Sequence, residues 1–233
     1  MAVKQEPKLK RAPLYEQIAN TLEEFIINEG VEEMRLPSEF ELAQQYQVSR
    51  TVIREALKIL KERGLVSMRV GDGLYTTRPK YALSSVMNRI VRFDHIDDAQ
   101  IASVRQILEE AACLQALRHA DERDFDLLET INQSMEAAKE DYDRRAALDY
   151  QFHYTLAKIG KNELLTDIIE SIMDILQDYI KRRLTSYPSG NQQGIEEHAL
   201  IIKTLRQRDS DKAVSLIRNH LKASYRQYKK NMR

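Results

Sequence analysis

Several residue types that mark particular protein classes are scarce in this sequence. Of its 233 residues, one is cysteine, seven are glycine and five are proline. A single cysteine cannot form an intramolecular disulfide, and the setting of Cys113, Ala-Ala-Cys-Leu, is typical of a small buried hydrophobe rather than a reactive thiol. The low glycine and proline content excludes a fold built mainly on turns and favours helices.

Net charge and long apolar runs are also absent. The 36 Lys and Arg residues balance 36 Asp and Glu residues, while 42% of the chain is hydrophobic. That hydrophobic fraction is enough for a core and excludes a wholly disordered chain. No apolar run reaches the ~18 residues that a membrane span requires. The N-terminus, MAVKQEPKLKRAP, is basic but lacks the apolar segment of a secretory signal. We therefore expect a soluble, cytoplasmic protein with no membrane contact.

The character of the sequence changes near residue 80. The first part contains short helical patterns followed by the one convincing hairpin, and Arg78-Pro79-Lys80 then starts a polar linker. The remainder is helical, with turns expected at Asp94-His95, Gly160-Lys161-Asn162, Ser186 to Gly194 and Asp209-Ser210. The predicted fold class is mostly α. We expect an N-terminal domain over residues 1–78, a linker over 79–82 and an antiparallel all-helical bundle over 83–233.

The N-terminal part combines three helical patterns with a glycine-tipped hairpin. An amphipathic helix is expected from about Pro13 to Asn28. Ser38 and Ser49 are suited to cap the next two helices at their N-termini, and Gly64 is suited to end the second of them. Gly-Asp-Gly at residues 71–73 is the tip of a two-stranded hairpin. A helix, a helix-turn-helix and a hairpin in this order predict a winged helix-turn-helix that binds DNA.

Basic residues are concentrated in this part. Residues 50–80 contain eight basic and three acidic side chains, although the whole chain is neutral. Arg50 and Arg54 lie four residues apart at the start of one helix, so both project from one face towards a major groove, and Arg69 lies on the hairpin. The alternative is a charged helical pair with an ordinary solvated face. The candidate DNA-binding residues are Arg35, Ser38, Glu39, Ser49, Arg50, Thr51, Arg54, Arg69 and Gly71.

Residues 36–76, LPSEFELAQQYQVSRTVIREALKILKERGLVSMRVGDGLYT, closely resemble the winged helix of the GntR family of bacterial transcription regulators. The sequence departs from the family pattern at two points. Phe40 stands where an arginine often follows Pro-Ser-Glu, and the turn before Arg35 lacks the usual Pro-Gly. The resemblance implies the fold and DNA binding, while Phe40 suggests a different operator or looser reading of the bases.

Four residues of the C-terminal part suit a metal site. Asp149 and His153 are four apart and share a helix face. His198 precedes Asp209 by 11 residues and His220 follows it by 11. If the helices on either side of this turn are antiparallel neighbours, both imidazoles lie level, about 16 Å from the turn. One carboxylate and three neutral imidazoles suit Zn²⁺, Ni²⁺ or Mn²⁺, with positions open for water or ligand. The alternative is ordinary polar structure.

Residues 83–230 resemble the helical effector-binding domain, the FCD domain, of the FadR-type GntR subfamily. The resemblance rests on segments Val104 to Glu109, Asp149 to His153, Gly160 to Asn162, Glu197-His198 and Asn219 to Leu221. Many members bind a divalent metal through one aspartate and three histidines. The resemblance therefore implies a metal at Asp149, His153, His198 and His220, with zinc as the first expectation and nickel or manganese as alternatives.

Arg105 and Asn162 are the candidate effector-binding residues. Arg105 lies in a largely apolar helix, where a guanidinium needs a partner because an unpaired buried charge is costly. That partner is either an effector carboxylate, which the resemblance favours, or a structural Glu or Asp. Asn162 either contacts the effector or caps the turn after Gly160.

These patterns predict a transcription regulator, with repression implied by the resemblance. We expect a homodimer on a palindromic DNA operator, whose DNA affinity changes when a small organic acid binds at the metal. The alternative is a regulator for which the cation itself is the signal. A metalloenzyme is disfavoured, because the sequence has no HEXXH motif and no evident general base, and because a winged helix serves no metabolic hydrolase.

Overall fold

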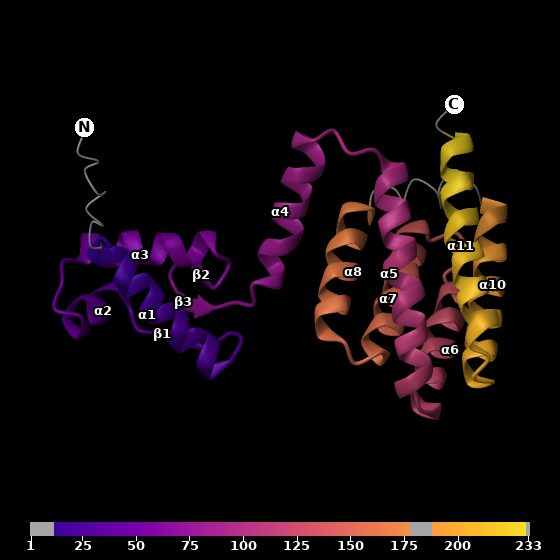
Figure 1. Ribbon diagram of the computed structural model, residues 1–233, viewed down its shortest axis with the longest axis horizontal. Coiled ribbons are helices and arrows are strands. Elements are labelled where there is room, and N and C mark those ends of the chain that lie inside the picture. Colours follow the sequence, from indigo (N-terminus) through magenta and orange to yellow (C-terminus); the bar gives the residue numbers. More distant parts are fainter. Residues whose placement is uncertain (1–11, 178–187, 232–233) are drawn as a thin grey trace, which may run out of the picture. The chain divides into compact units, whose positions relative to one another are not determined.

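The computed structural model describes residues 12–177 and 188–231, most of them helical (Figure 1). The chain divides into two compact units, Met1–Ala82 and Leu83–Arg233, and each has its own hydrophobic core. The mostly-α fold class, with an N-terminal helix-turn-helix and a C-terminal helical domain, is confirmed. Within the described ranges, no helix is long and apolar enough to cross a membrane.

The first unit is a winged helix-turn-helix. Its elements are α1 (Leu14–Glu29), β1 (Arg35–Leu36), α2 (Glu39–Gln45), α3 (Arg50–Glu62), β2 (Val66–Arg69) and β3 (Gly73–Thr76). The predicted caps define its helices: the Ser38 hydroxyl accepts the Glu41 amide at the start of α2, and the Ser49 hydroxyl accepts the Val52 amide at the start of α3. Gly64 follows α3 with φ +73°, a left-handed conformation that glycine adopts without strain.

The β2–β3 hairpin, which we call the wing, belongs to a three-stranded antiparallel sheet of order β1-β3-β2. β1 pairs with β3, so that Arg35 lies opposite Tyr75 and Leu36 opposite Leu74. The predicted two-stranded hairpin is present, and β1 adds a third strand that was not predicted. A two-residue strand is too short to show the alternation by which strands are detected in a sequence, and β1 is held by its backbone pairing and by the buried Leu36.

The core of the first unit explains why one face of α3 stays exposed. Ile53, Ala56, Leu57 and Leu60 of α3 are buried against α1 and the sheet. Because these residues recur at helical spacing, the positions on the other face of α3, including Arg50 and Arg54, point to solvent. Packing of the apolar face thus presents the arginines outward.

The second unit is a bundle of α4 (Lys80–Phe93), α5 (Asp98–His119), α6 (Glu122–Ala137), α7 (Tyr142–Ile159), α8 (Glu163–Ile175), α10 (Pro188–Arg206) and α11 (Ser210–Asn231). Helices α5, α6, α7, α10 and α11 lie side by side (Figure 1). α4 is attached through the Ser84 hydroxyl, which donates to Asp174 of α8 at 2.7 Å, and through Met87 and Val91, which pack against buried Ile101 and Ile172.

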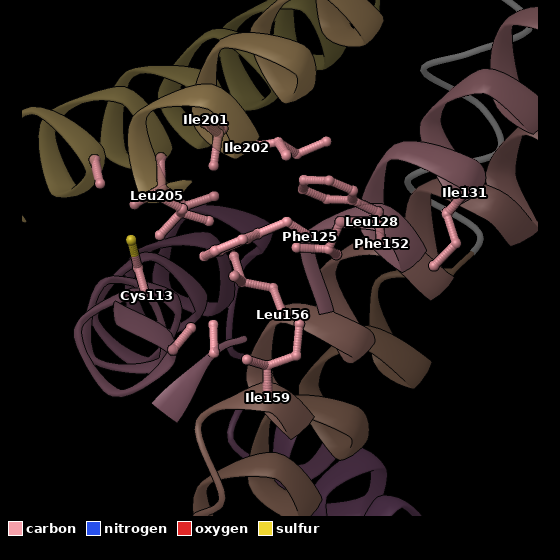
Figure 2. Close-up of a cluster of buried hydrophobic side chains, with 14 of the residues drawn as sticks. Cys113, Phe125, Leu128, Ile131, Phe152, Leu156, Ile159, Ile201, Ile202 and Leu205 are labelled. Atoms are coloured by element: carbon pink, nitrogen blue, oxygen red, sulfur yellow. The ribbon is translucent and has the colours of Figure 1, made fainter. Parts of the chain in front are cut away.

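The main core of the bundle lies between α5, α6, α7, α10 and α11. Figure 2 shows Phe125 and Phe152 among its aliphatic side chains, with Leu156 and Leu205 nearby. Cys113 belongs to this core, as predicted, and burial raises the pKa of its thiol to about 12. The thiol is therefore protonated at neutral pH and acts as a small apolar side chain.

One predicted turn is wrong. α10 already begins at Pro188, so residues 188–194 of the expected turn at 186–194 are helical, and residues 186 and 187 lie outside the described residues. Pro188 suits the first turn of a helix, where its missing N–H has no intrahelical acceptor. The other three predicted turns separate successive helices.

Candidate metal centre and DNA-binding surface

The four predicted metal ligands lie together inside the bundle. Asp149 and His153 come from α7, His198 from α10 and His220 from α11, and all four are buried. One potential ligand atom from each lies within 4.8 Å of the others. Two of the ligands come from one face of α7, and the other two face each other from the helices on either side of the turn at Asp209. We call this set the Asp–His cluster.

The distances within the cluster fit a divalent ion. The Nε2 atoms of His198 and His220 are 3.2 Å apart. Two imidazole nitrogens that bind one Zn²⁺ tetrahedrally at about 2.0–2.1 Å lie roughly 3.3 Å apart. Nε2 of His153 is buried, and within the described ranges no hydrogen-bond partner reaches it. A buried imidazole nitrogen without such a partner is costly, and coordination of a metal would satisfy it.

Phe152 fixes one ring of the cluster. Its ring stacks on that of His198, with centroids 3.9 Å apart and planes within 9°. Phe152 is itself fully buried in the main core shown in Figure 2. The orientation of the His198 ring therefore depends on core packing.

Two glutamates lie outside the cluster and hold two of its histidines. Oε2 of Glu109 is 2.5 Å from Nδ1 of His153, and Oε2 of Glu197 is 2.7 Å from Nδ1 of His220. An ionised carboxylate only accepts hydrogen bonds, so Nδ1 of His220 carries the proton and donates to Glu197. In a neutral His220 ring, Nε2 is then unprotonated and available to a metal.

The electrostatics define the charge states of Glu109 and His220. Burial would raise the pKa of the Glu109 carboxyl, but the guanidinium of Arg105 and the imidazole of His153 lower it to about 2, so it is ionised. Burial lowers the pKa of the His220 imidazole. The hydrogen bond with Glu197 raises this pKa, but by less than burial lowers it. A neutral His220 is the form that binds metal.

Arg105 pairs with a structural carboxylate. Its Nε donates to Oε1 of Glu109 at 2.5 Å, and both side chains are buried. This was the alternative to an effector clamp. Glu109 and Glu197 were missed as functional residues, although the i, i+4 spacing of Arg105 and Glu109 in an apolar helix was a signal for the first. Glu197 holds a histidine 23 residues away, and no local pattern predicts that contact.

The other polar residues of interest in the bundle have local roles. Asn162 caps α8, with its side-chain oxygen accepting the Leu165 amide at 3.1 Å. This was the alternative to its predicted effector contact. His95 adopts a positive φ in the turn before α5, and His119 is exposed at the end of α5. Neither belongs to the Asp–His cluster.

On the first unit, the arginines of α3 share an acidic partner. Arg54 donates to Glu39 through Nη2 at 3.0 Å and Nε at 3.4 Å, and Nη2 of Arg50 lies 3.8 Å from the same carboxylate. The hydrogen bond from Arg54 lowers the pKa of the Glu39 carboxyl, and burial opposes it. Glu39 therefore holds Arg54 in an extended position. Thr51 is exposed beside them, and Phe40 of α2 is 56% exposed.

The wing residues are braced by neighbours. Arg69 pairs with Glu33 at 2.7 Å and stacks on Tyr75, with its guanidinium carbon 4.4 Å from the ring centroid. Nη2 of Arg35 donates to the Asp72 carbonyl at 3.0 Å, which anchors the wing to β1. Gly71 forms the tip with φ +77°, which favours glycine.

Known protein families match both units of the chain. Residues 14–75 match the family described as bacterial regulatory proteins, gntR family, and residues 100–223 match the FCD domain, which covers more than half of the chain.

Named relatives are transcription regulators. The HTH-type transcriptional regulator LutR of Bacillus subtilis is 28% identical over 192 residues, which cover 80% of this chain and 88% of LutR. The HTH-type transcriptional repressor NanR of Salmonella typhimurium is 29% identical over 225 residues, covering 91% of this chain and 83% of NanR. The prediction of a regulator rather than an enzyme is confirmed by these relatives.

Solved structures share the fold. Streptococcus agalactiae GntR superimposes with a TM-score of 0.67 at 23% identity, covering 91% of this chain and 100% of that one. E. coli McbR/YncC gives a TM-score of 0.54 at 17% identity, covering 96% and 100%.

Proposed function

The chain belongs to the GntR family of bacterial transcription regulators and has an FCD effector-binding domain, and we propose that it is a repressor controlled by a small carboxylate that binds at a divalent metal. The observation that carries this proposal is the buried Asp–His cluster, in which four ligands from three helices meet within 4.8 Å. A cluster of this composition in a domain joined to a DNA-binding domain has a regulatory use rather than a catalytic one.

We propose that α3 enters the major groove of an operator. The exposed face of α3 presents Arg50, Thr51 and Arg54 at its first turns, which is where a recognition helix meets base edges.

Arg69 and Gly71 of the wing lie on exposed backbone suited to phosphate or minor-groove contact. Ser38 and Ser49 fix the two helix N-termini, and Arg35 and Glu39 support the wing and Arg54.

We propose that the protein binds a palindromic operator as a homodimer. Two apolar stripes of the bundle are exposed in the single chain: Val104, Ile107 and Leu114 on α5, and Val86, Ile90 and Phe93 on α4. Their spacing of three, four and seven residues places each set on one helix face. Such stripes are typical of surfaces that another chain covers, and a second copy gives the two-fold symmetry that a palindrome requires.

In this proposal Asp149, His153, His198 and His220 hold a divalent metal, with zinc as the first choice and nickel or manganese as alternatives. The bound metal would supply a fixed positive charge to which an organic carboxylate can coordinate. Arg105 contributes no net charge here, because it is paired with the ionised Glu109 that contacts His153. A small carboxylate is therefore the effector class that the local charge favours.

The repressor assignment follows from the similarity to NanR, which is a transcriptional repressor. An effector that binds the bundle in one conformation better than in another would change DNA affinity by that difference, typically ~1–3 kcal/mol. A bacterial regulator that acts on chromosomal DNA works in the cytoplasm, where we place this protein.

Thermal unfolding of three preparations tests the proposal: protein as purified, chelator-stripped protein and Zn²⁺-restored protein. Each is titrated with acetate, lactate, succinate and gluconate. We expect at least one acid to raise the Tm of the Zn²⁺-loaded form in proportion to RT ln(1 + [L]/Kd), and no acid to raise that of the stripped form.

The other outcomes contradict parts of the proposal. If Zn²⁺ alone stabilises the protein and changes its DNA affinity while no acid has an effect, the cation itself is the signal. If stripping and restoring Zn²⁺ leave the Tm unchanged, the Asp–His cluster is not a metal site.

A further inference from the structure

The two glutamates outside the Asp–His cluster are held in the same way. Each has one carboxylate oxygen beside the Nδ1 of a cluster histidine: Oε2 of Glu197 makes a hydrogen bond with His220 at 2.7 Å, and Oε2 of Glu109 lies 2.5 Å from His153 as an ion-pair contact. The second oxygen of each accepts from a side chain four residues earlier on its own helix. For Glu109 this donor is Arg105 at 2.5 Å, and for Glu197 it is Gln193 at 2.8 Å.

From this repeated arrangement we infer that Glu109 and Glu197 are positioning residues that set the metal affinity of the cluster, and that Arg105 and Gln193 act through them. The inference rests on the metal site of the proposed function. Neither glutamate is a ligand. Each fixes which nitrogen of its histidine carries the proton and in which direction Nε2 points.

The physical reason is that each carboxylate is held through both of its oxygens. A glutamate with one free oxygen can rotate, and its histidine can rotate with it. When the second oxygen is held by a donor on the same helix, the carboxylate plane is fixed, and the histidine ring is fixed in turn. A pre-oriented ligand loses less freedom when a metal binds, so affinity rises.

The two arrangements differ in burial, so substitutions in them have different effects on folding. Glu109 and Arg105 are almost fully buried, so changing either leaves a charge in the core. Glu197 is partly exposed, with 27% of its side chain accessible, and its donor Gln193 is neutral and exposed. Glu197 can therefore be changed with little effect on folding, which makes it the cleaner test.

Glu197 also connects two helices of the cluster. It lies on α10 one residue before the ligand His198, yet it holds His220 of α11. α10 thus supplies one ligand directly and orients a second. The His220 ring that Glu197 contacts has its Nε2 3.2 Å from Nε2 of His198.

The test is the Zn²⁺ affinity of the full chain, measured by competition with a chromogenic chelator. We expect E197Q to bind Zn²⁺ about 10–100-fold more weakly than wild type, the usual cost of losing an outer partner of a ligating histidine. Q193L, which releases the second oxygen, should give a smaller loss. The matched control is E196Q, which removes an exposed carboxylate from the adjacent position of α10 and should leave affinity unchanged.

Two further readouts separate positioning from a structural role. The Tm of metal-free E197Q should equal that of metal-free wild type, whereas the visible absorption bands of Co²⁺-loaded E197Q should shift because ligand geometry changes. E109Q should also weaken Zn²⁺ binding, with E110Q as its control, because Glu110 pairs with Arg218 on the bundle surface and reaches no cluster histidine. If E109Q does not fold, E197Q alone decides.

The outcomes distinguish the two claims. If wild type binds Zn²⁺ and E197Q binds it equally well with an unchanged Co²⁺ spectrum, the positioning inference is wrong and the metal site stands. If wild type binds no Zn²⁺, the proposed metal site is wrong and the inference falls with it. If E196Q weakens binding as much as E197Q, the effect is general charge and the inference is also wrong.

Discussion

Two arginine–glutamate pairs, one in each unit, show how burial changes the use of the same chemistry. Arg54 and Glu39 join α3 to α2, with 63% of the arginine side chain exposed. Arg105 and Glu109 join successive turns of α5, with 5% of the arginine side chain exposed. Both are charge-assisted hydrogen bonds, at 3.0 Å for Arg54 and 2.5 Å for Arg105. The main difference between the pairs is their burial.

The difference explains what each pair can do. Water already surrounds Arg54, so exchanging Glu39 for a phosphate or a guanine edge costs little free energy. The pair therefore holds Arg54 in place until DNA binds. Arg105 cannot leave Glu109 without stranding a charge in the core, so that pair serves as a fixed support for His153. The exposed pair can be exchanged and the buried pair cannot.

The largest effect is expected when the buried Arg105–Glu109 pair is broken. R105M removes the guanidinium and leaves the Glu109 carboxylate buried without its charge partner, which should lower the free energy of unfolding of the bundle by about 3–5 kcal/mol. Chemical denaturation followed by circular dichroism measures this. R54M is the matched control in the exposed pair and should lower stability only slightly, so equal losses for both variants would contradict the comparison.

The second effect concerns the stability that metal adds to the bundle. At Zn²⁺ concentrations 100 times Kd, wild type should gain about 2.7 kcal/mol. H198A should gain almost none, because one ligand and the ring stacked on Phe152 are lost. H119A removes an exposed histidine of α5 and should behave as wild type. Calorimetry with and without Zn²⁺ gives the result, and full stabilisation of H198A would exclude His198 as a ligand.

The third effect concerns DNA binding by Arg54 of the exposed pair. R54A should weaken binding to an operator duplex obtained by in vitro selection by roughly 5- to 150-fold, the usual cost of one lost bidentate base contact. Its free energy of unfolding should fall only slightly, since Arg54 is exposed. Fluorescence anisotropy measures the affinity, and R123A, which removes an exposed arginine of α6, is the control. Equal affinity of R54A and wild type would show that Arg54 does not contact DNA.

The smallest effect is the pH dependence of the exposed pair. Because the folded-state pKa of Glu39 lies below its ordinary value of 4.5, the pair stabilises the first unit above that value, and this contribution disappears as the pH falls through the lower folded-state pKa. E39Q should therefore be slightly less stable than wild type at pH 7, and the two should converge in acid. A difference that grows in acid would contradict the sign.

The sequence was sufficient for features that rest on local chemistry. Ser38 and Ser49 define where α2 and α3 begin, because a hydroxyl that accepts a free backbone amide has the same effect in any fold. The meeting of His198 and His220 was predictable for a related reason: two helices joined by a short turn bring positions equally distant from it to the same level.

What could not be predicted depends on contacts between distant residues. β1 is two residues long and exists because β3 pairs with it. Glu197 neighbours one cluster histidine in sequence but holds another on α11, a contact that only the packed bundle creates. Glu109 was partly predictable, since a buried arginine four residues earlier requires a carboxylate, but its second contact with His153 of α7 was not.

The most direct test of the account is operator binding by the full chain under four conditions: Zn²⁺-loaded or stripped, each with or without the acid that shifts the Tm. With the selected duplex, we predict that the acid changes the DNA affinity of Zn²⁺-loaded wild type by about 5- to 150-fold, and that stripped protein and H198A show no change. An equal change in stripped protein and H198A, or none in Zn²⁺-loaded wild type, would contradict control of DNA binding through the Asp–His cluster.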